Sequence, residues 1–227
     1  MGIAQACLRY SWGKRMNIYN HIAQLIKRYP VLQACESEIW SAFTNIRDSF
    51  RTGGMLLVCG NGGSGADSEH IVGELMKEFA IKRPLSDEMK EKLKNASLEN
   101  GELLAEHLQG GLPAVTLTSN IALSTAFAND AVPELVFAQQ VCGYGDDKSV
   151  LMGISTSGNS KNVIYAVETA KALGMKTVGM TGEKGGGLKE LCDVCICVPA
   201  VATPNIQELH LPVYHTICMM LEEEFFG

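Results

Sequence analysis

The sequence predicts an α/β fold, a three-layer αβα sandwich built on a five-stranded parallel sheet. Short apolar runs recur along the chain and alternate with helical patterns, which is the order expected of a parallel sheet covered on both faces. Two of these runs also end in loops rich in glycine and serine that lead directly into a helix. The five predicted strands lie near residues 54–59, 114–118, 149–154, 176–181 and 194–198.

The predicted helices fill most of the gaps between these strands. Residues 17–52 are expected to form two N-terminal helices, and the apolar side chains of the first form a stripe that needs a partner surface; they are Ile18, Ile22, Leu25 and Ile26. Later helices are predicted from Asp67 to Phe79, from Lys161 to Leu173 and from about Ile206 to Phe226. We interpret residues 1–227 as a single domain.

Two segments depart from this regular order. Residues 1–15 show no clear periodicity and precede a second methionine, Met16, so we expect a disordered extension or a start-codon artefact. Residues 85–111 are polar and charged, with a helix start at Ser86 and breaks at Asn100–Gly101 and Gly110–Gly111. This second segment separates the first glycine-loop helix from the second strand. We interpret it as a helical insertion with a functional or interface role.

Composition narrows the class of partner. A net charge of -6 and a pI near 5.4 argue against nucleic acid, because binding to a phosphate backbone needs a basic face. No apolar run approaches the roughly 20 residues of a membrane span, and the N-terminus lacks the apolar core of a signal peptide. We therefore expect a cytoplasmic protein without a membrane partner.

The eight cysteines do not indicate a disulfide framework in a chain of this size and class. The one cluster is Cys192, Cys195 and Cys197, on a predicted strand and just before it. Alternation along the strand puts Cys195 and Cys197 on the same face. Packing is favoured over metal binding, because free cysteine behaves as a small buried hydrophobe.

The two glycine- and serine-rich loops predict an anion site. The first is Gly60-Asn61-Gly62-Gly63-Ser64 and the second is Ser155-Thr156-Ser157-Gly158-Asn159-Ser160. A loop of this kind at a helix N-terminus can direct backbone N–H groups at a phosphate. Neither loop has the spacing of a dinucleotide fingerprint or the ending of a Walker loop. Four hydroxyls in six residues suit a small phosphorylated ligand better.

The helix after the first loop carries His70 and Glu74, which are four residues apart and share one face. Such a pair can hold a divalent metal, or it can place a base beside its orienting partner. The alternative is a solvated or core-satisfied pair. Its position one to two turns from the glycine loop, at about the length of a sugar from a bound phosphate, favours chemistry.

The last helix offers Gln207 and His215 within an apolar run. They are eight residues apart, about 12 Å along a straight helix, which is wide for two ligands of one metal. Pro212 lies between them and should bend the axis. Either the side chains lean inward across that bend, or the two residues reach a shared site from different subunits.

The sequence resembles the sugar isomerase (SIS) domain family and, within it, the phosphoheptose isomerases. The resemblance covers nearly all of residues 17–226 outside the insertion and rests on residues 59–64, 70–75, 128–130, 153–163, 181–182 with 185–186, and 206–210 followed by His215. It departs from the family at Gly65, at Pro204 and in the length of segment 85–111.

This resemblance implies a set of site residues. The phosphate of a sugar would be bound by Ser155, Thr156, Ser157 and Ser160 with help from Asn61, Gly62 and Ser64, and Asp130 and Gln207 would contact substrate. One zinc ion per site would be held by His70, Glu74, Gln207 and His215, of which Glu74 and His215 would be the acid/base pair. The family further implies a homotetramer with active sites at subunit contacts.

The implied reaction is an aldose–ketose isomerisation, from sedoheptulose 7-phosphate to D-glycero-D-manno-heptose 7-phosphate in heptose biosynthesis. A base removes a proton beside the carbonyl, an acid delivers one to the neighbouring carbon, and a metal can polarise the carbonyl. The alternative is a non-catalytic relative, a sugar-phosphate sensor or a partner of the replication initiator. Such a binder would keep the phosphate loop and could lose the acid/base residues. Retention of His215 favours the enzyme.

Overall fold

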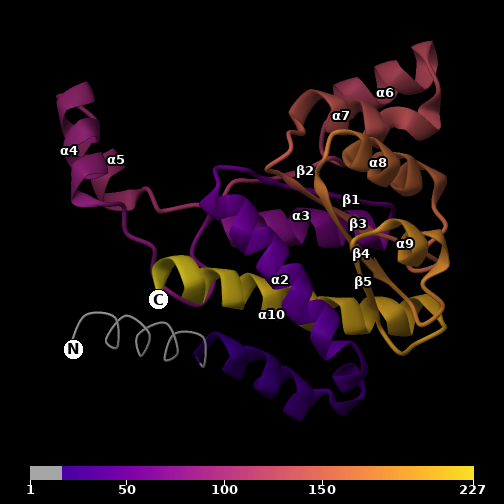
Figure 1. The fold of residues 1–227 in the computed structure, drawn as a ribbon. Helices are drawn as coiled ribbons and strands as arrows, with labels where there is room; N and C mark the ends of the chain where they lie inside the picture. The colour runs from indigo at the N-terminus through magenta and orange to yellow at the C-terminus, as the bar shows by residue number, and fades with distance from the viewer. Residues whose placement is uncertain (1–16) are drawn as a thin grey trace.

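The computed structural model describes residues 17–227, and its centre is a five-stranded parallel sheet (Figure 1). The strands are β1 (Leu56–Gly60), β2 (Ala114–Thr116), β3 (Val150–Ile154), β4 (Lys176–Thr181) and β5 (Val194–Cys197), in the spatial order β2-β1-β3-β4-β5. All four neighbouring pairs are parallel. The predicted fold class and the five predicted strands are confirmed, with ends that differ by up to two residues.

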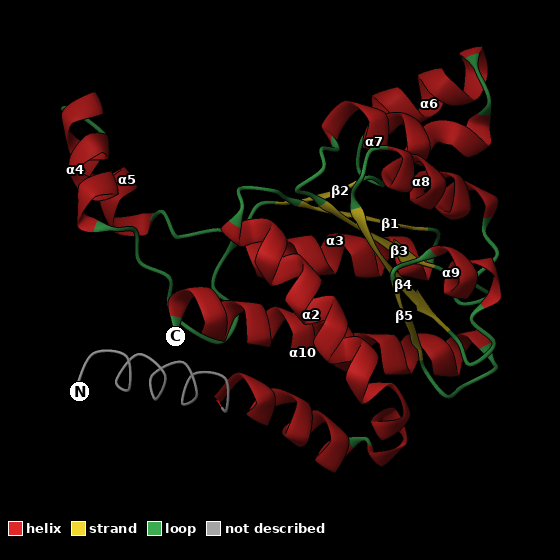
Figure 2. Cartoon of the chain, in the orientation of Figure 1, coloured by secondary structure: helices red, strands yellow, loops and turns green. Residues whose placement is uncertain are grey.

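Helices cover both faces of this sheet (Figure 2). One face carries the helix over residues 17–28, α2 (Glu36–Arg51), α3 (Gly63–Met76) and α10 (Thr203–Phe226). The other carries α7 (Val136–Tyr144), α8 (Lys161–Ala172) and α9 (Gly186–Leu191). Shorter elements complete the chain: η1 (Pro30–Cys35), α4 (Asp87–Ala96), α5 (Gly101–His107), α6 (Ile121–Asp130) and η2 (Pro133–Leu135).

The strands divide the core into two apolar layers with a period of two residues. Leu56 and Val58 of β1 face the cluster that includes α10, whereas Leu57 and Cys59 face the cluster that includes α8. This is the alternation that the pleat of a strand imposes. All five residues of β1 are buried, as a parallel strand covered on both faces should be.

One sequence-based prediction is corrected here. The helix after the first loop begins at Gly63 and not at Asp67, so the glycines themselves form its first turn, and it ends at Met76 before reaching Phe79.

The stripe on the N-terminal helix finds its partner surface in the core of its own chain. Ile18, Ile22 and Leu25 are at most 4% exposed, and the partly buried Ile26 packs against the same cluster.

The insertion is a helical hairpin formed by α4 and α5 that projects from the body of the molecule (Figure 1). Ser86 caps α4 by accepting a hydrogen bond from the Met89 amide, so the predicted helix start is confirmed. At the base of the hairpin Pro84 is bridged to Gln109. The predicted break at Asn100–Gly101 coincides with the start of α5, whose first residue, Gly101, lies against the backbone of Lys94.

The cysteine cluster packs as the alternation predicts. The Sγ atoms of Cys195 and Cys197 are 3.8 Å apart on one face of β5. Burial raises the pKa of Cys192 and of Cys195 to about 12, so both remain thiols at neutral pH. Residues 1–15, for which a disordered extension is predicted, lie outside the described residues. No helix in the described part of the chain is both long and apolar enough to cross a membrane.

Candidate active site

The topology brings both predicted loops to one edge of the sheet. β1 lies between β2 and β3, so the strand order reverses between β1 and β3. In open α/β sheets ligands bind beyond the carboxyl ends of the strands at such a switch point. The first loop follows β1 and the second follows β3, which places both at that point.

The second loop, residues 155–160, is held in shape by its own hydroxyls and by the turn before α9. Ser155 Oγ lies 3.0 Å from Ser160 Oγ, and Ser157 Oγ accepts a hydrogen bond from the Asn159 amide at 3.2 Å. Gly158 has a φ of +68°, and a side chain there would overlap the carbonyl of Gly185. The loop therefore depends on a close approach between backbones, while Ser157 stays exposed and Thr156 half-buried.

The first loop uses several of its own groups internally. The amides of Ser64 and Gly65 donate to the carbonyls of Asn61 and Gly62, both at 3.0 Å, so these two N–H groups are not offered to an anion as the loop pattern suggests. The side chain of Asn61 exchanges two hydrogen bonds with Asn162, at 2.9 and 2.8 Å. This amide pair ties the first loop to the start of α8 and so fixes the two loops relative to each other.

The histidine–glutamate pair meets His215 within one chain. His70 Nε2 lies 3.1 Å from Glu74 Oε1 on α3 and 3.4 Å from His215 Nε2 on α10. His70 lies seven residues beyond Gly63, about 10 Å along the helix axis. The three side chains thus lie about one sugar length from the loops, and His215 comes from the same chain.

Gln207 and Asp130 are the two remaining predicted site residues. The Gln207 side chain lies beside Gly63, at the first loop. Asp130 is exposed at the end of α6, where it accepts a hydrogen bond from Asn129 at 2.8 Å. No hydrogen bond in the described part of the chain joins either residue to His70, Glu74 or His215.

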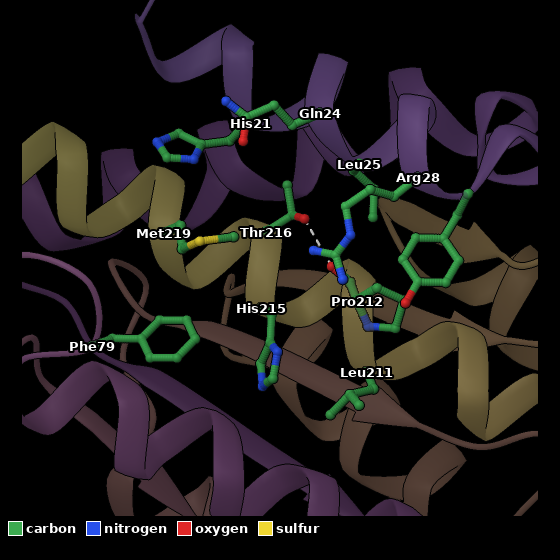
Figure 3. A pocket seen from close by; sticks show the side chains of 11 residues that line it. His21, Gln24, Leu25, Arg28, Phe79, Leu211, Pro212, His215, Thr216 and Met219 are labelled. Atoms are coloured by element: carbon green, nitrogen blue, oxygen red, sulfur yellow. Dashed lines mark hydrogen bonds between the residues drawn. The ribbon is translucent and has the colours of Figure 1, made fainter.

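His215 borders a cavity of about 260 Å³ between the N-terminal helix and α10. Figure 3 shows its ring with Phe79 on one side and Leu211 on the other, below the helix that carries His21 and Arg28. Burial and the neighbouring charge of His70 lower the pKa of His215, and Glu74 partly opposes this. The imidazole of His215 is therefore biased towards its neutral form.

Two contacts of Tyr214 in the site were not predicted from the sequence. Tyr214 Oη lies 3.0 Å from His70 Nδ1 and donates to Asp67 Oδ1 at 3.2 Å. Burial raises the pKa of Asp67, and the hydrogen bond from Tyr214 opposes that rise. The one available signal was spacing, because Asp67 precedes His70 by three residues and so shares its helix face. Tyr214 lies within an apolar run of the sequence, so nothing in the sequence indicates a polar contact for its hydroxyl.

A buried ion pair also secures the end of α3. Glu222 accepts hydrogen bonds from the amides of Phe79, Ala80 and Ile81 and from Arg83 Nε, all within 2.7–3.1 Å. Arg83 in turn donates to the carbonyls of Leu75 at 2.6 Å and Glu74 at 3.0 Å. Both charged side chains are fully buried. The pair fixes the helix carrying Glu74 to the helix carrying His215.

The donor chemistry of the three side chains fits a zinc ion. Two imidazole nitrogens and a carboxylate are ordinary zinc ligands, and donors of one tetrahedral zinc lie about 3.3–3.4 Å apart. The two separations here are 3.1 and 3.4 Å, and Glu74 Oε2 is buried without a hydrogen-bond partner. Among the described residues, however, no group of three or more His, Cys, Asp or Glu side chains is arranged so that it could hold a metal ion.

Comparison with known proteins agrees with this architecture. SIS domain models match residues 19–109 and 114–221. The phosphoheptose isomerase of Akkermansia muciniphila is 34% identical over 92% of this chain and 97% of the relative, and that of Burkholderia pseudomallei is 41% identical over 79% and 78%. The structure of a phosphoheptose isomerase from Francisella tularensis superposes with a TM-score of 0.70 at 29% identity, covering 93% of this chain and 97% of the other. The chain therefore belongs to the SIS domain family and, within it, to the phosphoheptose isomerases.

Proposed function

We propose that this protein interconverts sedoheptulose 7-phosphate and D-glycero-D-manno-heptose 7-phosphate. The observation that carries the proposal is the meeting of His70, Glu74 and His215 about 10 Å along α3 from the glycine loop, in a chain that is similar over 92% of its length to a phosphoheptose isomerase. The substrate phosphate would bind at residues 155–160, and the carbonyl end of the sugar would reach the three side chains.

In the proposed mechanism the Glu74 carboxylate accepts a proton from the carbon beside the carbonyl. The electron pair of that C–H bond moves into the new carbon–carbon double bond of an enediol. The same proton, or one from solvent, is then returned to the neighbouring carbon, while His215 transfers a proton between the two oxygens. A neutral imidazole suits this role because one ring nitrogen can donate its proton to one oxygen and then take up a proton from the other.

Zinc is proposed as the cofactor, one ion per site, with His70, Glu74 and His215 as ligands and Gln207 as a fourth ligand or a substrate contact. When bound it would act as a Lewis acid that polarises the carbonyl. The nature of the donor set supports this proposal, and so does Glu74 Oε2, which accepts no hydrogen bond although Lys77 Nζ lies 3.6 Å away. Total metal analysis of the protein, purified without chelators, would test it.

We further propose a cytoplasmic homotetramer whose sites lie at subunit contacts. The exposed position of Asp130 supports this, because a residue expected to contact substrate has no contact with the site in its own chain. Light scattering at micromolar concentration should give four times the chain mass. A monomer under those conditions would refute the proposed assembly but would not test the proposed reaction.

The decisive experiment is deuterium exchange. Wild-type protein incubated with sedoheptulose 7-phosphate in D2O should incorporate deuterium beside the carbonyl and form the aldose. Glu74→Gln and His215→Ala should each abolish incorporation while sugar-phosphate binding stays measurable, because the hydroxyl loop supplies the hold on the phosphate. Wild-type protein that binds this ligand without exchange would refute the isomerase and indicate a sugar-phosphate sensor.

A further inference from the structure

The hydroxyl of Tyr214 lies between two side chains of α3. Tyr214 is 1% exposed, and its Oη is 3.2 Å from Asp67 Oδ1 and 3.0 Å from His70 Nδ1. The rings of His70 and Tyr214 also meet edge to face, with centroids 5.5 Å apart. One buried phenol therefore touches both a carboxylate and the histidine that lies at the centre of the site.

The direction of the two hydrogen bonds follows from the groups involved. A carboxylate only accepts hydrogen bonds, and a phenol has a single proton to donate. The contact with Asp67 uses that proton. Tyr214 Oη must then accept from His70, which requires a proton on His70 Nδ1.

The other nitrogen of His70 faces Glu74 at 3.1 Å and His215 at 3.4 Å. Left alone, a neutral His70 would donate Nε2–H to the Glu74 carboxylate and so lose the lone pair that a metal or a transferred proton needs. Asp67 acts against this through Tyr214, because it stabilises the proton on the opposite nitrogen. Histidine ligands are commonly held this way by a carboxylate behind them.

We propose that Asp67 and Tyr214 are positioning residues that keep a proton on His70 Nδ1 and orient Nε2 towards Glu74 and His215. The use made of Nε2 rests on the proposed function. The hydrogen-bonded arrangement itself does not, and it can be tested in protein without metal or substrate.

The first test is nitrogen-15 NMR of the histidine rings in metal-free protein. The chain has five histidines, so His70 can be assigned by comparison with a His70→Ala variant. In wild-type protein we expect a His70 Nδ1–H resonance protected from exchange with water, and we expect Tyr214→Phe to abolish that protection. Tyr144→Phe, which removes a phenol from an exposed site on α7, is the matched control and should leave the resonance unchanged. A wild-type His70 that carries its proton on Nε2 alone would overturn the proposal.

The second test is a double-mutant cycle on zinc affinity, measured by competition with a chelator. Tyr214→Phe should weaken zinc binding about 10- to 100-fold, the usual effect of losing such a partner, and Asp67→Asn should weaken it by less because the amide oxygen can still accept. Because Asp67 acts through the phenol, Asp67→Asn should add nothing in the Tyr214→Phe background. Additive losses would mean that the two residues act separately. They would refute the proposed relay, by which we mean the chain of hydrogen bonds from Asp67 through Tyr214 to His70.

These tests separate the relay from the proposed reaction. A wild-type protein that shows the protected Nδ1–H but neither binds zinc nor exchanges deuterium refutes the proposed function and leaves the relay intact. A wild-type protein that isomerises the sugar and binds zinc, with affinity unchanged in Tyr214→Phe, refutes the relay and leaves the function intact.

Discussion

Replacing Glu222 by glutamine tests how the end of α3 is held to α10. Glu222 is fully buried and its carboxylate accepts from the amides of residues 79–81 and from Arg83 Nε. Glutamine keeps the shape of the side chain but loses the charge, and its NH2 group faces donors where an oxygen stood. The fully buried Arg83 is then left without its counter-ion.

The expected loss of stability is large because the pair lies out of water. Removing one partner of a buried ion pair costs about 3–5 kcal/mol. Since glutamine retains one carbonyl acceptor, we expect the lower end, about 3 kcal/mol. For a chain of this size that corresponds to a fall in Tm of roughly 6–12 °C.

Guanidinium-induced unfolding at one fixed protein concentration is the assay, because assembly would otherwise shift the apparent stability. Glu224→Gln is the matched control on the same helix. Glu224 pairs with Arg51, and the side chains of Arg51 and Glu224 are 53% and 8% exposed, so removing this half-exposed pair should cost less than removing the fully buried one. If Glu222→Gln destabilised the protein no more than Glu224→Gln, the reasoning about the buried pair would be wrong.

Three further outcomes follow from the site and its surroundings. Ser157→Ala should raise KM more than it lowers kcat, because its hydroxyl holds a part of the substrate remote from the reaction; steady-state kinetics showing an unchanged KM would count against the loop. Gly158→Ala should abolish phosphosugar binding in calorimetry, since a Cβ would overlap Gly185, whereas Gly143→Ala on α7, with open space at its Cα, should bind normally. Burial lowers the pKa of His210 from 6.5 to about 4, so the unfolded chain takes up a proton first as pH falls. The free energy of unfolding should therefore drop by up to about 3 kcal/mol between pH 6.5 and 4, and His210→Phe should flatten that drop.

The parts of the fold that follow local rules could be predicted from the sequence. Strand β1 was predictable because five consecutive apolar residues, 55–59, run directly into a glycine loop. The start of α3 was not, because glycine has a poor intrinsic preference for helix. Gly63 begins the helix here because the turn amides of Ser64 and Gly65 find their acceptors in Asn61 and Gly62.

The candidate site likewise has a part that could be predicted from the sequence and a part that could not. His70 and Glu74 share a helix face, so their pairing follows from spacing alone. Their meeting with His215 depends on how α10 packs against α3, which no spacing within one helix determines. Tyr214 could not be recognised for the same reason. Its role comes from a contact across 144 positions of sequence.

Because of the contacts at the base of the α4–α5 hairpin, the insertion can change in length without changing the geometry of the site. Pro84 and Gln109 are bridged, and the Gly110 amide donates to the Arg83 carbonyl at 2.7 Å, so the chain leaves and returns at nearly the same place. Residues can be gained or lost between those points while Arg83 keeps its hold on Glu222 and on the end of α3. During divergence of the family this would let the projecting segment change freely, as an accessory module on a catalytic body that stays constant.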